Sequence, residues 1–195
     1  MGLHPAVYFY SASGRHQPTA VLALAALFTD LEKENKFIDF CRVRESFEKF
    51  LLDHKMYINQ LTSKQGSMAK GFRHMRDYYR LVLDSLWMQK SHDEIESALS
   101  ETEKFRRLVK ETPVLSTKPK TFSRGVKQYI VISEALANAS ICDLCHARID
   151  LKAMNVDHIK DRSKGGVGSG ENARPLHPYC NSTYKKWLEE HPTTN

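Results

Sequence analysis

Two pairs of metal-binding residues near the end of the sequence constrain this chain more than any other feature. Cys142 and Cys145 are separated by two residues, and so are His177 and Cys180. A tight turn with this spacing presents two ligands, and two such turns can hold one tetrahedral zinc ion. Because protein ligands would take all four positions, the spacing predicts a structural rather than a catalytic zinc site.

The segment that carries these pairs has few large apolar residues with which to build a core. It also contains four glycines between residues 165 and 170, which makes a long connecting loop costly to order. Structural zinc binding contributes folding free energy on the order of 10 kcal/mol. A zinc site therefore explains how such a segment can fold.

Two alternatives to the four-ligand site stay open at the level of sequence. The Cys142-x-x-Cys145 pair could serve redox chemistry, with His177 nearby by chance. Alternatively, His177 joins a catalytic set and zinc keeps three protein ligands. The mirrored spacing of the two pairs favours four ligands over both alternatives. The remaining cysteine, Cys41, falls in a helical pattern and is expected in the core.

A second set of polar residues lies between the two pairs and directly after them. Asp157 precedes His158 in a strand-like segment, Asn172 follows the glycine-rich loop, and Asn181 follows Cys180. Carboxylate and amide oxygens suit hard cations, so Asp157 and Asn181 are predicted to hold Mg²⁺ or Mn²⁺. An imidazole titrates near neutral pH, so His158 is predicted to remove a proton from water. Asn172 is expected to fix the loop by side-chain hydrogen bonds to the backbone and to keep His158 oriented.

This combination meets the requirements of phosphodiester hydrolysis. The reaction needs a base for the water, a Lewis acid for the charge on oxygen, and groups held roughly in line. The sequence therefore predicts a metal-dependent endonuclease with a structural zinc and a catalytic magnesium or manganese. The alternative is a zinc-framed module that binds nucleic acid without cleaving it. Such a module has no use for both oxygen ligands and a base, which favours the nuclease.

The charge of the chain favours a polyanionic partner such as DNA. The formal net charge is +6 and the isoelectric point is about 9.1, and basic side chains bind phosphates by releasing counterions. Residues 104–127 contain eight basic residues and one acidic residue, and they form either a solvated linker or a phosphate-contacting strip beside the site. The basic residues expected to bind DNA near the site are Lys160, Arg162, Lys164, Arg174, Lys185 and Lys186.

The rest of the chain is predicted to be mainly helical. Apolar residues recur at helical spacing over 18–34, 37–54, 68–88 and from residue 92 onward, where Ser91 begins a capping box. An extended arm or short strand is expected over 6–10. A helix after Ser123, strands over 155–159 and 173–176, and a helix over 182–190 complete the chain. The fold class is α+β, with an α-helical domain over 1–111, a basic linker over 112–122 and a small zinc-stabilised domain over 123–195.

The motifs over residues 123–195 resemble those of HNH endonucleases of the ββα-metal type with a zinc-binding frame. The resemblance implies that Asp157 and Asn181 are metal ligands, that His158 is the general base, and that Asn172 is the middle asparagine of the signature. Two positions depart from the usual pattern. His177 stands where cysteine is commoner, and Asn181 replaces the last histidine of the signature.

Residues 8–19 resemble part of a group of bacterial defence proteins. Those proteins join a ParB-like nucleotide-hydrolysing domain to a C-terminal HNH nuclease and restrict phage DNA. The resemblance implies a role in restricting foreign DNA, and that this chain is the C-terminal piece of a longer protein with such a domain as its partner. The helical half would dock a partner domain or a second copy, and the sequence does not predict the oligomeric state.

The start of the chain lacks the pattern of a secretory signal peptide. No apolar run approaches the roughly 18 residues that a membrane-spanning helix needs. We therefore expect a cytoplasmic protein that does not enter a membrane, in a reducing compartment that keeps cysteines free for metal.

Overall fold

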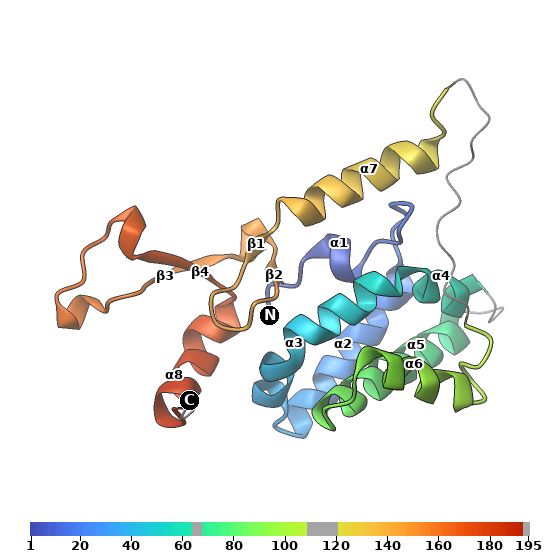
Figure 1. Ribbon diagram of the computed structural model, residues 1–195, viewed down its shortest axis with the longest axis horizontal. Coiled ribbons are helices and arrows are strands. Elements are labelled where there is room, and N and C mark those ends of the chain that lie inside the picture. Colours follow the sequence, from blue (N-terminus) through green and yellow to red (C-terminus); the bar gives the residue numbers. More distant parts are fainter. Residues whose placement is uncertain (64–67, 109–120, 193–195) are drawn as a thin grey trace.

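A bundle of helices makes up most of the N-terminal half (Figure 1). The computed structural model describes residues 1–63, 68–108 and 121–192. In the bundle, α2, α3 and α4 pack against the long helix α5, which also contacts α6. The helices of this half are α1 (Pro5–Tyr8), α2 (Pro18–Lys33), α3 (Phe37–Asp53), α4 (Lys55–Ser63), α5 (Met68–Trp87) and α6 (His92–Glu101).

Aromatic side chains at helical spacing build the core of the bundle. Phe40 and Phe47 lie on one face of α3 and meet edge to face, and Phe47 packs in the same way on Tyr79 of α5. All three are fully buried. Pro18 begins α2, where its missing N–H costs nothing. Ser91 and Glu94 form the predicted capping box at the start of α6. The helices predicted over 18–34, 37–54 and 68–88 are confirmed, and each ends one residue earlier than expected.

Two sequence predictions in this half are wrong. Residues 6–10 do not form a strand, because Pro5–Tyr8 make the short helix α1. Its buried residues pack against α3, and the ammonium of Lys55 donates to the carbonyls of Ala6 and Val7. The second error is the omission of α4, which follows α3 after a single break at His54. The start signal at Gly66 and Ser67 lies outside the described residues.

The C-terminal part contains one long helix, two small hairpins and a short helix. Helix α7 (Arg124–Ala137) is capped by Ser123 as predicted. Strands β1 (Ser140–Ile141) and β2 (Arg148–Ile149) pair antiparallel, as do β3 (Asn155–His158) and β4 (Ala173–Leu176). A π-helical turn, Cys180–Tyr184, then leads into α8 (Lys185–Glu190). Most of the predicted linker over 112–122 lies outside the described residues, so the boundary there stays a prediction.

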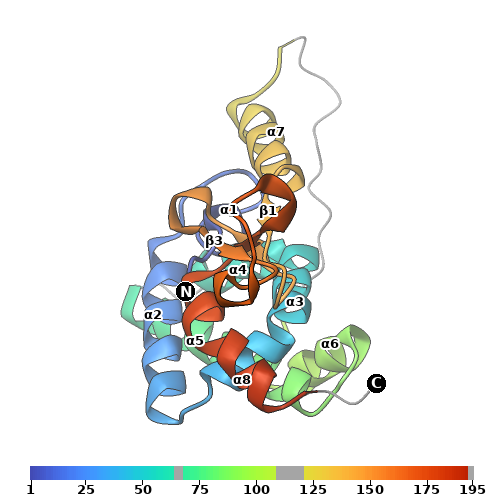
Figure 2. The same cartoon turned by 90° about the vertical axis from the view of Figure 1, so that its left-hand side faces the viewer.

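Helix α7 stands out from the rest of the molecule. It has no buried residue, and Ile130 and Val131 are more than half exposed. Both views show it extending beyond the bundle, while the β3–β4 hairpin and α8 lie together on another side (Figures 1 and 2). Among the described residues, no helix combines the length and the apolar character needed to cross a bilayer.

Buried polar groups join the two halves of the chain. One carboxylate oxygen of Glu48 on α3 accepts from the hydroxyl of Tyr8 at 2.8 Å, and the other accepts from the backbone N–H of Arg148 in β2 at 2.9 Å. Leu3 forms an antiparallel bridge to Ile149, so the N-terminus lies beside β2 (Figure 1). The β1–β2 hairpin therefore rests on the helical half through specific hydrogen bonds.

The burial of Lys55 predicts a pH-dependent contribution to stability. Burial lowers the pKa of this lysine from 10.5 to about 7. Between these two values the unfolded chain binds a proton that the folded chain does not, so this group makes the free energy of unfolding rise as pH increases through that window. The slope is at most about 1.4 kcal/mol per pH unit.

The measurement is urea unfolding between pH 7 and 10, compared between the wild type and Lys55→Met. The variant should show a smaller rise in the free energy of unfolding with pH. Lys49→Met, which alters an exposed lysine of α3, should behave like the wild type. Equal slopes in all three proteins would contradict the prediction.

Candidate functional site

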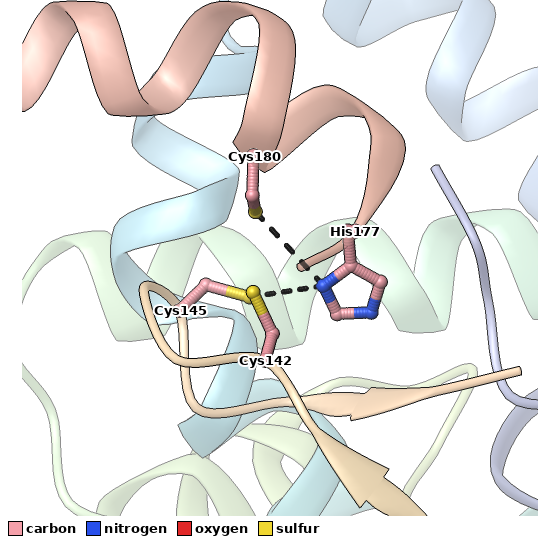
Figure 3. A group of neighbouring side chains, drawn as sticks. All are labelled: Cys142, Cys145, His177 and Cys180. Carbon is pink, nitrogen blue, oxygen red and sulfur yellow. Dashed lines mark hydrogen bonds between the residues drawn. The ribbon is translucent and has the colours of Figure 1, made fainter. Parts of the chain in front are cut away.

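Four side chains from two separate turns meet in one buried cluster (Figure 3). Cys142 and Cys145 come from the turn between β1 and β2, and His177 and Cys180 follow β4. Their ligand atoms all lie within 4.8 Å of one another. Ligands of a tetrahedral zinc ion, with bonds of about 2.0–2.3 Å, are spaced in this way. The donor set, three sulfurs and one imidazole nitrogen, also suits zinc.

Backbone hydrogen bonds shape the first turn. The N–H of Cys142 donates to the carbonyl of Ala147, and the N–H of His146 donates to the carbonyl of Cys142, each at 2.9 Å. His146 adopts a left-handed conformation with φ of 55°. These bonds close a loop that points both cysteine sulfurs inward.

The orientation of His177 favours its role as a zinc ligand. Its Nε2 lies 3.1 Å from the carbonyl oxygen of Arg148, which can only accept, so Nε2 carries the proton. Nδ1 therefore keeps its lone pair and faces the sulfurs, at 3.3 Å from Cys145 and 3.9 Å from Cys180. An outer hydrogen bond of this kind fixes the ring of a metal-bound histidine. The geometry supports four ligands rather than a three-ligand zinc with His177 among the catalytic residues.

The sulfurs lie close enough to interact with one another. Hydrogen bonds from Cys145 and Cys180 lower the pKa of Cys142, while hydrogen bonds to Cys142 raise the pKa of Cys145 and that of Cys180. Cys41 is buried as predicted, and its thiol lies within hydrogen-bonding reach of Cys180.

Asp157 lies in the middle of a small ionic cluster. Arg174, its partner across the β3–β4 pair, donates to Oδ2 from Nε and Nη2 at 3.1 and 3.0 Å. The ammonium of Lys185 lies 3.1 Å from Oδ1 and 3.0 Å from Oδ2. Burial alone would raise the pKa of Asp157, but the hydrogen bonds from Lys185 and Arg174 outweigh it and hold the pKa below its usual value. The carboxylate is therefore charged and faces positive groups.

Asn172 fixes the glycine-rich loop, as predicted. Its side-chain oxygen accepts from the N–H of Lys160 at 2.7 Å. Its amide nitrogen donates to the carbonyls of Lys160 and Val167 at 3.1 and 2.8 Å. The backbone of Asn172 also accepts from the N–H of Ile159. Both ends of the loop are thus tied directly after the strand that carries His158.

His158 is half-buried at the end of β3 and lies at a shallow pocket. The pocket has a volume of about 280 Å³ and lies between β3 and the returning part of the loop. It is lined by Val156, Asp157, His158, Gly168, Ser169, Gly170, Asn172 and Ala173. The structure therefore brings three of the predicted site residues, Asp157, His158 and Asn172, around one cavity.

Asn181 is not among the residues that line this pocket. It follows Cys180 in the π-helical turn and is half-buried. Its N–H donates to the carbonyl of His177 at 2.9 Å. Lys185, four residues later, reaches Asp157. The metal-binding cluster thus determines where the turn starts, and the turn leads directly toward Asp157.

The six predicted DNA-binding residues divide into two groups. Arg174 and Lys185 turn toward Asp157. The other four are exposed: Lys160, Arg162 and Lys164 on the loop, and Lys186 on α8. The described parts of the basic run are residues 104–108, at the end of the bundle, and residues 121–127, at the start of α7. Both lie away from the β3–β4 hairpin (Figure 1), which does not favour a phosphate-contacting strip beside the site.

Sequence analysis missed the contribution of the helical half to the metal-binding cluster. Arg44 and Glu48 are fully buried on α3, and Glu48 holds the strand whose carbonyl orients His177. One signal was present in the sequence. Two charged residues four apart interrupt the apolar stripe that includes Phe40 and Phe47, and charged residues in such a stripe are rarely buried unless paired.

Comparison with known proteins gives a match in the C-terminal segment. Residues 142–186 match the family model described as HNH endonuclease. The match begins at the first cysteine of the cluster and ends in α8. No curated protein and no solved structure matches the chain. The chain therefore carries a small C-terminal HNH domain with short sheets and a Cys/His cluster, and this match supports a nuclease-type function on nucleic acid.

The cluster predicts that the C-terminal domain loses its structure when metal is removed. The purified chain should contain about one zinc per molecule, measured by plasma mass spectrometry. Chelation or Cys142→Ser should abolish zinc binding, because a structural site needs all its ligands. Cys41→Ala should retain zinc. Loss of zinc in that variant, or wild-type zinc content in Cys142→Ser, would contradict the four-ligand assignment.

The glycine-rich loop offers a matched pair of substitutions. A Cβ on Gly166 would lie 1.8 Å from the carbonyl oxygen of Lys160, whereas a Cβ on Gly168 would meet nothing within 4 Å. Gly166→Ala should therefore displace the loop and weaken its attachment to Asn172. Gly168→Ala should leave it unchanged. NMR amide shifts of the loop test this, and equal perturbation by both substitutions would refute it.

Proposed function

We propose that the C-terminal domain is a metal-dependent DNA endonuclease that hydrolyses phosphodiester bonds, with His158 as general base. The observation that carries the proposal is the pocket at the end of β3. Within the segment that matches HNH endonucleases, it gathers an imidazole, a charged carboxylate and the asparagine that fixes the loop.

His158 would accept a proton from the attacking water. Its half-buried position at an open pocket lets water approach while limiting the orientations of the ring. The hydrogen bonds of Asn172 to Lys160 and Val167 hold the backbone that follows His158. Asn172 therefore serves as a positioning residue for the base, since it makes no hydrogen bond to the imidazole among the described residues.

Asp157 and Asn181 would hold Mg²⁺ or Mn²⁺ through oxygen atoms. The donor chemistry fits, because magnesium takes one or two carboxylates and completes its coordination with water and phosphate oxygens. The ammonium of Lys185 touches both oxygens of Asp157, which indicates that a positive group can reach the carboxylate. When bound, the cation supplies Lewis-acid stabilisation of charge on the phosphate oxygens.

Arg174 and Lys185 would compensate phosphate charge beside the reacting group. Both already lie within 3.1 Å of Asp157, so a phosphate that approaches this carboxylate would meet two positively charged side chains. Lys160, Arg162, Lys164 and Lys186 are exposed and would contact flanking phosphates. Because such contacts release counterions, binding should weaken steeply with salt.

A second candidate is a zinc-framed module that binds nucleic acid without cleaving it. The ion pairs of Asp157 with Arg174 and Lys185 favour this reading, because they neutralise the carboxylate without any metal. Under this alternative, Asp157 braces the hairpin against α8. The chain would then bind DNA and leave it intact with every divalent cation.

The role in restriction of foreign DNA rests on the resemblance at residues 8–19 alone. These residues form the end of α1, the turn after it and the start of α2. A nucleotide-hydrolysing domain elsewhere in a longer protein would be the natural partner. Plating efficiency of phage on cells that express the full-length protein, with and without His158→Ala, tests this role.

The nuclease proposal predicts that His158→Ala abolishes cleavage without unfolding the domain. Loss of a general base typically lowers the rate by about 10²–10⁴-fold. Plasmid cleavage in Mg²⁺ or Mn²⁺ measures the effect, and zinc content confirms that the fold survives. His16→Ala, which alters an exposed histidine of the helical half, is the matched control.

Two results would separate the candidates. Full cleavage by His158→Ala would remove this residue from the mechanism. Salt-sensitive DNA binding by the wild type, with no cleavage in any divalent cation, would instead favour the non-catalytic module.

A further inference from the structure

A zinc centre with three cysteines and one histidine carries a net single negative charge, because three thiolates outweigh one divalent cation. The four ligands are all buried, with 4% exposure at most. A buried charge is costly unless an opposite charge lies near it. If zinc binds at this cluster, a positive group close to it is therefore expected.

Arg44 on α3 is placed to supply that charge. Cys41, one turn before it on the same helix, packs in one cluster with Cys142, Cys145 and Cys180, and α3 contacts the turn that begins at Cys180. Arg44 is fully buried. Residues three apart on a helix share a face, so Arg44 points to the same side of α3 as Cys41.

Two short series of contacts connect α3 with His177, one through Arg44 and one through Glu48. In the first series, Nη1 of Arg44 donates to the carbonyl of Met1 at 3.1 Å. The next residue, Gly2, is so close to the ring of His177 that a Cβ there would lie 3.1 Å from Cδ2. In the second series, Glu48 accepts a hydrogen bond from the N–H of Arg148, and the carbonyl of Arg148 accepts one from His177.

The guanidinium has donors that protein groups do not use. Nε lies 3.5 Å from Glu48, which is an ion-pair distance, yet neither Nε nor Nη2 makes a hydrogen bond within the described part of the chain. Glu48 accepts its hydrogen bonds from Tyr8 and Arg148 instead. Buried donors without partners are costly, so a further negative partner is needed to explain them.

We infer that Arg44 provides the countercharge of the zinc–thiolate centre, which makes helix α3 an outer layer of that centre. Burial alone would lower the pKa of Arg44, but Tyr8, Glu48 and the sulfurs of Cys145 and Cys180 together raise it. This agrees with a guanidinium that interacts electrostatically with the sulfurs as well as with the carboxylate of Glu48. Arg44 acts on the metal ligands through charge and is a positioning residue, with no contact to substrate.

The simpler reading is that Arg44 serves only as the ion-pair partner of Glu48. The two readings differ in the sign of one effect. If Arg44 balances the sulfurs, Glu48 competes for its charge, and Glu48→Gln should leave zinc affinity unchanged or increase it. If Arg44 serves Glu48 alone, Glu48→Gln leaves a buried charge without a partner and should weaken zinc binding.

The experiment measures the zinc dissociation constant of the full chain by competition with a chromophoric chelator. Arg44→Met should raise the constant about 10–100-fold, the usual effect of losing an outer partner of a metal site. Arg44→Lys, which keeps the charge, should stay within about 3-fold of the wild type, well below the usual effect. Lys49→Met, which removes an exposed positive charge from the same helix, should have no effect.

Two further variants keep the test decisive if Arg44→Met fails to fold. The side chain that Glu48→Gln introduces can still accept from the N–H of Arg148 and donate to the hydroxyl of Tyr8, so this variant should fold. Zinc binding about 10-fold weaker in Glu48→Gln, the size of effect expected for a lost outer partner, would overturn the inference. The double variant Arg44→Met/Glu48→Gln removes both charges. It should still bind zinc more weakly than the wild type, and wild-type affinity would also overturn the inference.

Discussion

The hydrogen bond from His177 to the carbonyl of Arg148 is the contact through which the metal-binding cluster is joined to β2 and, by the same residue, to α3. It sets the tautomer of His177 and turns Nδ1 toward the three sulfurs. The N–H of the same residue, Arg148, donates to Glu48 in the helical half. One residue of β2 therefore connects a buried carboxylate in α3 to the metal-binding cluster, and the cluster in turn fixes the start of the turn that carries Asn181 and Lys185.

The domain separates two kinds of electrostatic environment over a short distance. The sulfur cluster is dry and enclosed, and it suits a soft, borderline ion held permanently. The carboxylate of Asp157 is only half-buried and is bound by the charged side chains of Arg174 and Lys185. The π-helical turn Cys180–Tyr184 joins the two, because one end carries a sulfur ligand and the other leads to Lys185.

Local patterns in the sequence predicted the parts of the structure that depend on near neighbours. The helices α2, α3, α5 and α6, the capping box at Ser91, the strands β3 and β4 and the loop bonds of Asn172 all depend on spacing within a few residues or on side chains of known turn chemistry. The four-residue cluster was also predictable, because ligand spacing is a strong signal.

Features that depend on distant partners were not predictable. An extended arm or short strand is expected over residues 6–10, yet Pro5–Tyr8 form the helix α1, which packs on α3 and is bound by Lys55. Nothing in the sequence near Asp157 pairs it with Lys185, and nothing near Cys41 points to cysteines a hundred residues later. Such contacts follow from the tertiary arrangement, and propensity does not encode them.

The bridge between Leu3 and Ile149 has a consequence for the order in which the molecule assembles on the ribosome. Leu3 is synthesised long before Ile149, so it meets its partner only after the helices between them have emerged. Contacts between such remote segments slow folding, since a large loop must close before they form. Leu3 therefore stays without its partner while the helices between it and β2 are completed.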